Sequence, residues 1–169
     1  YFLLHAAASP NPGTLGPART ITYRTANYTN FNITADLLPG WAGGGGVNGS
    51  YVQAMGLVAR LNNIAIGQLN GYAFLYLNCD QSAPRPFVQN SLTIVRLTQE
   101  LNYGPPGSGN GSPGETDWRS ITLDNAKGYR FQFIGKGTHL EGRVYDLANT
   151  NTPIAVLDAN TAGQPAVYV

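Results

Sequence analysis

The chain is poor in charge and in long apolar runs. Lys, Arg, Asp and Glu make up 11% of its 169 residues, against about 25% in an average soluble domain. The ten basic residues are scattered singly and the net charge is +1, which argues against a partner of nucleic acid or acidic lipid. No apolar stretch approaches the ~20 residues that span a bilayer as a helix. We therefore expect no nucleic-acid partner and no membrane span.

Cysteine and histidine are almost absent, which removes several kinds of site. Cys79 is the only cysteine, so an intrachain disulfide and a cysteine metal cluster are excluded. We interpret it as a small apolar residue at a strand end, with a reactive or intermolecular thiol as the alternative. His5 and His139 are the only histidines. Their spacing is not that of a zinc site, and the sequence has no nucleophile elbow with which a catalytic histidine could act.

The nine acidic residues are dispersed and form no Asp-x-Asp-x-Asp calcium loop. Calcium is the one cofactor hypothesis left open. Its site would combine loop carbonyl groups with Asp36, Asp80 or Asp146. The alternative is that these are ordinary turn and strand-end aspartates.

Glycine and proline are abundant instead, with 21 and 11 residues, which is typical of an extracellular all-β protein with long polar turns. The length suits one domain with a core of its own. Residues 9–18 carry three prolines and two glycines and indicate an extended connector. We therefore divide the chain into an N-terminal apolar segment with its connector, 1–18, and a β domain, 19–169. Glycine-rich stretches at 41–50 and 104–114 indicate loops.

The strongest local signal predicts one long β-hairpin over residues 129–147. Aromatic residues occupy every second position of Tyr129–Phe133, and apolar residues alternate again in Leu140–Leu147, the period of a half-buried strand. Gly135–Gly137 is predicted as a three-residue turn, because glycine accepts positive φ at little cost. A hairpin with one apolar face is marginal alone, so it requires a partner sheet.

Other segments rich in β-branched and aromatic residues predict further strands. A helix over 51–61 is the alternative at one of them, but Gly56 and the flanking asparagines favour a strand. About ten strands and no helix, with turn signals about every 8–12 residues, predict an antiparallel two-sheet jelly-roll sandwich. The predicted strands outside the hairpin are 19–24, 31–37, 51–61, 71–79, 91–98, 118–123, 154–159 and 166–169.

Six segments in order resemble the concanavalin A-like, laminin G-type jelly-roll domain of secreted and cell-surface proteins, over roughly Ile21 to Val169. The resemblance implies two curved antiparallel sheets. It also implies extracellular glycan binding, adhesion, or a non-catalytic module beside an enzyme, since fold does not fix function. The six segments are Phe31–Gly40, Gly56–Leu61, Gly71–Tyr76, Leu92–Leu97, Gly128–Phe133 and Leu140–Leu147.

The chain departs from this family in two ways. Such domains usually continue into one more strand after a segment like 166–169, whereas this sequence stops there. An apolar strand-like segment, 1–8, also precedes the connector here. Laminarinase-type glycosidases of this fold use a Glu-x-Asp-x-x-Glu strand that carries a nucleophile and a general acid. The similar stretch that begins at Glu115 has Ser120 in the last position, so one of the two carboxylates of the retaining mechanism is missing. We therefore expect no enzyme.

Aromatic residues and sequons suggest two kinds of contact with glycans. Trp41, Tyr51 and Trp118 lie near glycine-rich loops and are candidates for stacking on a bound sugar, with burial in the core as the alternative. Four Asn-x-Ser/Thr sequons are candidates for N-glycosylation. They begin at Asn27, Asn32, Asn48 and Asn110.

The N-terminal segment suggests an assembly mechanism. Its apolar residues are Phe2, Leu3, Leu4 and Ala6, and eight extended residues span about 26 Å. Donated to the sheet edge of the next copy, this segment would build a filament of identical subunits. The alternatives are that it folds back on its own sheet or is a signal-peptide remnant. We expect an extracellular or cell-surface structural subunit, with a glycan-binding module as the alternative function.

Overall fold

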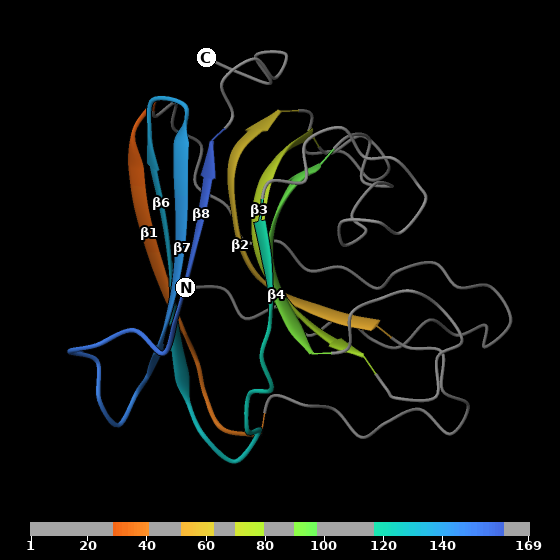
Figure 1. The fold of residues 1–169 in the computed structure, drawn as a ribbon, viewed down its shortest axis with the longest axis vertical. Coiled ribbons are helices and arrows are strands. Elements are labelled where there is room, and N and C mark those ends of the chain that lie inside the picture. The colour runs from red at the N-terminus through yellow and green to blue at the C-terminus, as the bar shows by residue number, and fades with distance from the viewer. Residues whose placement is uncertain (1–28, 41–51, 63–69, 80–89, 98–116, 161–169) are drawn as a thin grey trace, which may run out of the picture.

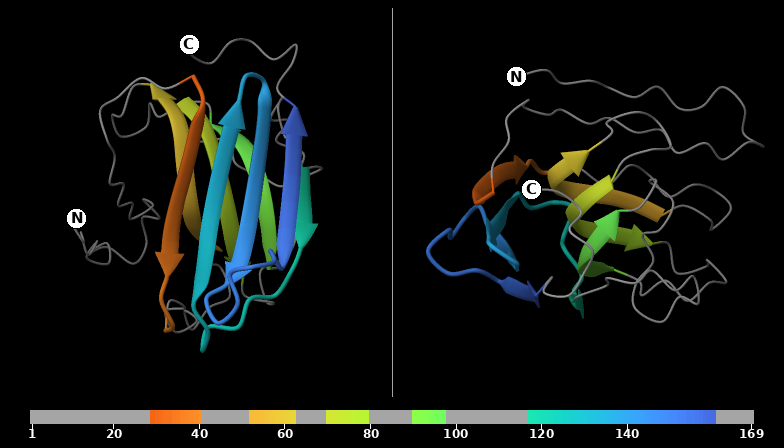
Figure 2. Two further views of the ribbon diagram at one scale, coloured as in Figure 1. Left: turned by 90° about the vertical axis from the view of Figure 1, so that its left-hand side faces the viewer. Right: turned by 90° about the horizontal axis from the view of Figure 1, so that it is seen from above.

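The computed structural model describes residues 29–40, 52–62, 70–79, 90–97 and 117–160. These residues form two β-sheets that face each other as two layers, and they contain no helix (Figures 1 and 2). The described strands are β1 (Phe31–Leu37), β2 (Val52–Asn62), β3 (Asn70–Cys79), β4 (Ser91–Leu97), β5 (Asp117–Ser120), β6 (Tyr129–Lys136), β7 (His139–Asp146) and β8 (Ala155–Asn160).

Both sheets have four strands and every pairing is antiparallel. The first, which we call the β1 sheet, has the order β1-β6-β7-β8, and the second, the β2 sheet, has the order β2-β3-β4-β5. After β1 the chain crosses to the β2 sheet, runs through it as a meander, and returns with β6 beside β1, as the left view of Figure 2 shows. The prediction of an antiparallel two-sheet architecture is confirmed.

The predicted hairpin is the β6–β7 pair, and its alternation is confirmed. Along β6 the inner positions are buried and the outer positions are half-buried. The prediction of a three-residue turn at Gly135–Gly137 is wrong, because Lys136 pairs with His139. Only Gly137 and Thr138 form the turn, and Gly137 has φ +56°, as the first residue of a type II′ turn requires. Gly135 lies inside β6 and makes room for the Phe31 ring, which a Cβ would strike.

The other strands follow the prediction with one shortening. The strand at 51–61 is confirmed within one residue, so the helix alternative is wrong. The strand predicted over 118–123 ends at Ser120. Beyond it, the backbone N–H of Ile121 donates to the carbonyl of Asn90 (2.8 Å), and that of Leu123 donates to the Tyr76 hydroxyl (3.1 Å). The strands predicted at 19–24 and 166–169 lie outside the described residues.

The core lies between the two sheets and is built by alternation. Phe74 of β3 packs across the interface on Phe131 and Phe133 of β6, with ring centroids 5.7 and 6.0 Å apart. Each fully buried side chain of this kind contributes roughly 1.5–3 kcal/mol of transfer free energy. The largest fully buried apolar side chains are Tyr76, Phe74, Phe133, Leu92, Ile94, Leu140, Leu157, Val95 and Val144.

Candidate functional site

The two edges of the β1 sheet differ in how well their core-facing side chains are covered. On β8, the inner residues Ala155, Leu157 and Ala159 are only 1–2% exposed. On β1, the inner residues are half-buried, and Ala35 is exposed although it lies on the same face. The sandwich is therefore closed along β8 and open along β1.

The open side forms an apolar strip that we call the β1 seam: Phe31, Ile33, Ala35 and Leu37 of β1 with Met55 of β2. Phe31 makes an edge-to-face contact with Phe133, with centroids 5.1 Å apart. Met55 is half-buried and packs on the same core from the facing edge strand. Among the described residues, β1 pairs with β6 alone, along seven residues in continuous register. A regular, unbulged strand of this kind can accept another strand at its free edge.

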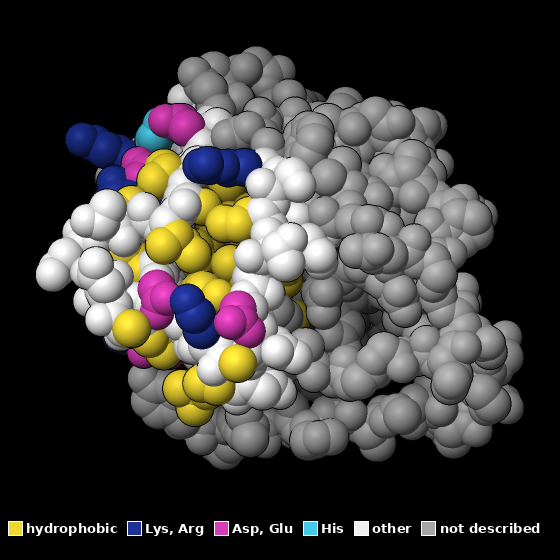
Figure 3. Space-filling model, turned by 60° about the horizontal axis from the view of Figure 1, so that its bottom comes forward, with side chains coloured by type: hydrophobic (Ala, Val, Ile, Leu, Met, Phe, Trp, Pro, Cys, Tyr) yellow, Lys and Arg dark blue, Asp and Glu magenta, His cyan; other side chains and the backbone are white. Residues whose placement is uncertain are grey.

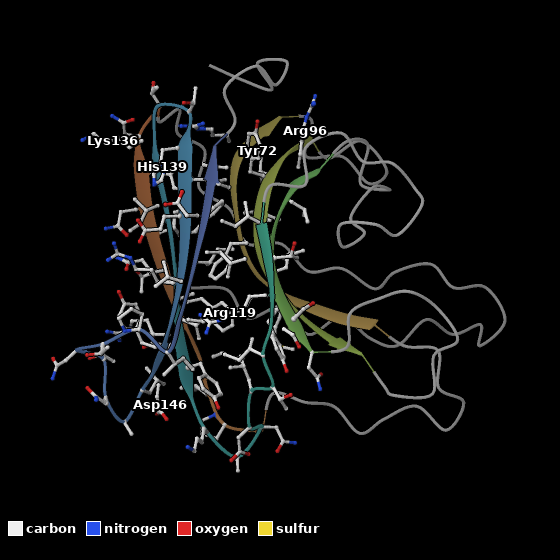
Figure 4. All side chains as sticks on the ribbon, in the orientation of Figure 1. Tyr72, Arg96, Arg119, Lys136, His139 and Asp146 are labelled. Atoms are coloured by element: carbon white, nitrogen blue, oxygen red, sulfur yellow. The ribbon has the colours of Figure 1, made fainter. Side chains whose placement is uncertain are left out.

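The edges of the β2 sheet carry features that oppose strand addition. β5 has only four residues, and its Arg119 pairs in register with the core residue Leu92. Arg119 is exposed and extends into the space between the sheets (Figure 4). β2 pairs regularly with β3 from Val52 to Ala59 and then has a register shift between Ala59 and Asn62. Short strands, inward charges and irregular pairing all protect natural sheet edges.

Arg60, which lies in that irregularity with φ +51°, closes one end of the β1 seam. Its guanidinium donates to the carbonyl of Thr29 (2.7 Å) and to that of Gly137, and it lies 5.6 Å from the centre of the Phe31 ring. The backbone N–H of Gly137 donates to Asn30 Oδ1 (3.0 Å). These contacts tie β2, the start of β1 and the β6–β7 turn together, so the chain enters β1 at a fixed point.

The outer face of the β1 sheet is polar and linked by side-chain hydrogen bonds. Arg130 donates twice to Asp36, at 2.7 and 2.8 Å. This hydrogen bonding lowers the pKa of Asp36 and raises that of Arg130. Gln132 donates to Asn32 (2.9 Å) and accepts from the Tyr145 hydroxyl (3.1 Å). The hydrogen bonds connect β1, β6 and β7 across this face.

Further along the same face, Arg143 donates to Glu141, and this contact is the main cause that raises the pKa of Arg143. His139 Nδ1 lies 3.2 Å from an oxygen of Asp158, which joins β7 to β8. Figure 4 shows His139 near the turn at one end of the sheet. Among the residues that the structure describes, the exposed large apolar side chains are Leu38, Ile154 and Val156. Figure 3 shows apolar groups interrupted by charged and other polar ones.

The candidate calcium ligands are not brought together. Asp36 occupies the outer face of β1, and both of its oxygens accept from Arg130. Asp146 is the register partner of the inner residue Tyr129, so it lies on the opposite face, where it is 3.6 Å from Lys127. Asp80 lies outside the described residues. Within the described ranges, no group of three or more His, Cys, Asp or Glu residues converges.

Most of the glycan and donor candidates fall where the structure gives no description. Trp118 lies in β5, but its side chain is not described. Asn32 is exposed on the outer face of β1, as its place on the polar face predicts. Trp41, Tyr51, Asn27, Asn48, Asn110, Glu115 and the donor segment with Phe2, Leu3, Leu4 and Ala6 lie outside the described residues.

Sequence reasoning missed the residues that shape the β1 seam. The alternation of 31–37 places Ala35 on the apolar face, but no local pattern says that this face is uncovered. Arg60 is a single basic residue in an apolar strand, and that isolation was the only signal available for it.

No family model, no curated protein and no solved structure matches this chain. Within the described ranges, no helix has the length and hydropathy for a bilayer crossing.

Proposed function

We propose that this protein is a non-catalytic extracellular structural subunit that polymerises by strand donation. In this proposal the domain is a jelly roll of the concanavalin A-like type, and the apolar segment 1–8 of one copy pairs with a sheet edge of the next. The contact is head-to-tail and does not close on itself, so the product is a filament. The single observation that supports it most is the β1 seam, where the core of the sandwich is left partly uncovered.

Two further features support an assembly role over a catalytic one. The polar side chains of the outer face hydrogen-bond mainly to one another, which holds them in place as a surface. The carboxylate pair of a retaining glycosidase is already incomplete in the sequence, with Ser120 in place of the second glutamate. Of the four edges in the described part of the chain, β1 has the least covered inner side chains, which suits a directional contact with one partner at that edge.

The test is a deletion of residues 1–8 from the full chain. The intact protein should form filaments visible by negative-stain microscopy and light scattering. The deleted protein should stay folded by circular dichroism, remain monomeric, and bind the free 1–8 peptide. A matched control replaces residues 1–8 with eight glycine and serine residues, which keeps the length but removes the apolar side chains. It should behave as the deletion does.

Either of two results would overturn the proposal. One is that the deleted protein forms the same assemblies as the intact chain. The other is that the intact protein stays monomeric and binds an oligosaccharide saturably, with the binding lost in Trp41→Ala. The second result would favour the glycan-binding module instead.

A further inference from the structure

The four edge strands of the described sandwich are not equivalent acceptors, and their differences rank them. β5 is short and carries Arg119 on its core side. β2 has a register shift at its end, and its inner residues Leu57 and Ala59 are already buried. β8 already has its inner side chains buried at 1–2% exposure, so an added strand would find little apolar surface to cover. Only β1 combines a regular seven-residue edge with uncovered apolar side chains.

We propose that the acceptor is the free edge of β1, that its occupant is segment 1–8 of a second copy, and that Leu4 of this segment lies beside Ala35. This inference rests on the proposed strand donation and adds the edge, the direction and the register. Residues 1–8 are long enough to pair along all seven residues of β1.

The pattern of side-chain sizes favours an antiparallel register. Every pairing in the β1 sheet is antiparallel, and Phe2, Leu4, Ala6 and Ala8 would share one face of an extended segment. With Leu4 beside Ala35, a large residue meets the one small inner residue of β1. The same register puts Ala6 beside Ile33 and Ala8 beside Phe31, so the small residues of the donor meet the large residues of the acceptor. Burial of complementary volumes is what close packing requires.

Other registers are less favourable. A shift by one residue turns the opposite face of the donor inward and would place His5 against the apolar seam, where a polar ring without a partner is costly to bury. A parallel arrangement would put the bulky Phe2 near Phe31 and leave the alanines beside Ala35 and Leu37. The first alternative buries a polar ring, and the second pairs large residues with large ones and small residues with small ones, which packs less closely.

Disulfide trapping tests the edge and the register. All variants carry Cys79→Ser, so each chain has only the cysteine that is introduced. Directly opposed residues in a sheet have Cβ atoms about 4.5–5.5 Å apart, near enough for a disulfide after small adjustments. Mixed and oxidised Leu4→Cys and Ala35→Cys proteins should give a covalent dimer on a non-reducing gel. Leu4→Cys mixed with Ala155→Cys, a core-facing residue of β8 at the opposite edge, should not.

A pair of lysine variants tests the same edge without covalent cross-linking. Ala35→Lys places a charge on the inner side of β1, the natural device against strand addition, and should raise the concentration needed for filament assembly at least about tenfold. Thr34→Lys adds the same charge at an exposed outer position of the same strand and should leave that concentration unchanged. Because both positions are exposed, neither lysine has to enter the core.

The outcomes separate this inference from the proposed function. Filaments that cross-link through Ala155→Cys but not through Ala35→Cys would overturn the β1 assignment and keep strand donation. A Leu4→Cys, Ala35→Cys double variant that forms only an intrachain disulfide would show pairing within one chain and overturn both. Equal effects of Ala35→Lys and Thr34→Lys on assembly would also contradict the β1 seam as the acceptor.

Discussion

At Gly142 of β7 the two sheets lie so close together that a side chain would strike the opposite sheet. Replacing Gly142 by alanine therefore tests the packing of the core. A Cβ at this position would lie 2.5 Å from both Cδ2 and Cε2 of Phe74 and 2.8 Å from its Cγ. Optimal carbon–carbon contacts are about 3.5–4.0 Å, so the ring has to move by roughly 1 Å. Phe74 is fully buried and packs on Phe131 and Phe133, which leaves it little room.

The expected cost is set by two opposing effects. Overpacking a core costs about 1–3 kcal/mol. Replacing glycine in a strand recovers roughly 0.5–1 kcal/mol, because alanine has less conformational entropy to lose on folding. The φ of Gly142 is not among the positive values, so the backbone itself accepts alanine. We expect Gly142→Ala to lower the free energy of unfolding by about 1–2 kcal/mol, or the melting temperature by roughly 2–8 °C.

Urea denaturation followed by tryptophan fluorescence measures this change, and a double-mutant cycle with Phe74→Leu identifies its cause. If the methyl group strikes the ring, the cost of Gly142→Ala should largely disappear in the Phe74→Leu background. Gly137→Ala is the contrasting control, because a Cβ there meets nothing within 4 Å and only the positive φ resists it. A Gly142→Ala protein as stable as the wild type, or a cost unchanged by Phe74→Leu, would refute the reasoning.

Three further changes have expected outcomes. Phe133→Ala removes a fully buried ring and should lower the free energy of unfolding in urea by about 3–5 kcal/mol. A decrease below about 1 kcal/mol would contradict the position of Phe133 at the centre of the core. Gly135→Ala should lower the free energy of unfolding by less than Gly142→Ala does, because the Phe31 ring that the new methyl group strikes is half-buried and can move. An equal or larger decrease would contradict the exposure of the β1 seam. The lowered pKa of Asp36 stabilises the fold above the ordinary carboxyl pKa of about 3.9, and this contribution is lost as pH falls through the lowered value. Because the pair is more than a third exposed, Asp36→Asn should cost less than ~1 kcal/mol at neutral pH, and the difference should shrink as the pH falls below the ordinary carboxyl pKa; a difference that does not change with pH would exclude the ion pair as its cause.

The sequence predicts strands and faces well where alternation is strict. The hairpin at 129–147 is the clearest case, because aromatic side chains mark its inner face at every second residue. Its turn was mispredicted because two glycines flank Lys136 and only one of them bends the chain. Gly137 has positive φ, whereas Gly135 is needed for the space taken by Phe31. A sequence does not distinguish a glycine chosen for conformation from one chosen for room.

The end of β5 and the exposure of Ala35 escaped prediction for a related reason. Ile121 and Leu123 continue an apolar pattern, but their backbone N–H groups donate to Asn90 and Tyr76, which are distant in sequence. Ala35 belongs to an apolar face by its period, and its exposure depends on what the rest of the chain places over that face. Both features are set by tertiary contacts, so only the donor half of the proposed assembly was visible in the sequence.

Strand donation needs a donor and an acceptor that the same chain keeps apart until a second copy arrives. In the proposed assembly the donor is the apolar segment 1–8, and the connector 9–18 is proline-rich, a composition that acts as a semi-rigid spacer. At the acceptor, Arg60 contacts Thr29 and the Phe31 ring, so the first residues of β1 are held in place. These residues are ordered before a partner arrives, and Ala35, near the middle of β1, is uncovered. In the proposed assembly this edge would therefore lose little conformational entropy when a strand is added. Arg60→Ala should leave the fold intact but weaken assembly. Arg119→Ala, at the opposite side of the sandwich, should leave assembly unchanged. This pair of results would show that the contacts of Arg60 at the start of β1 contribute to binding the partner.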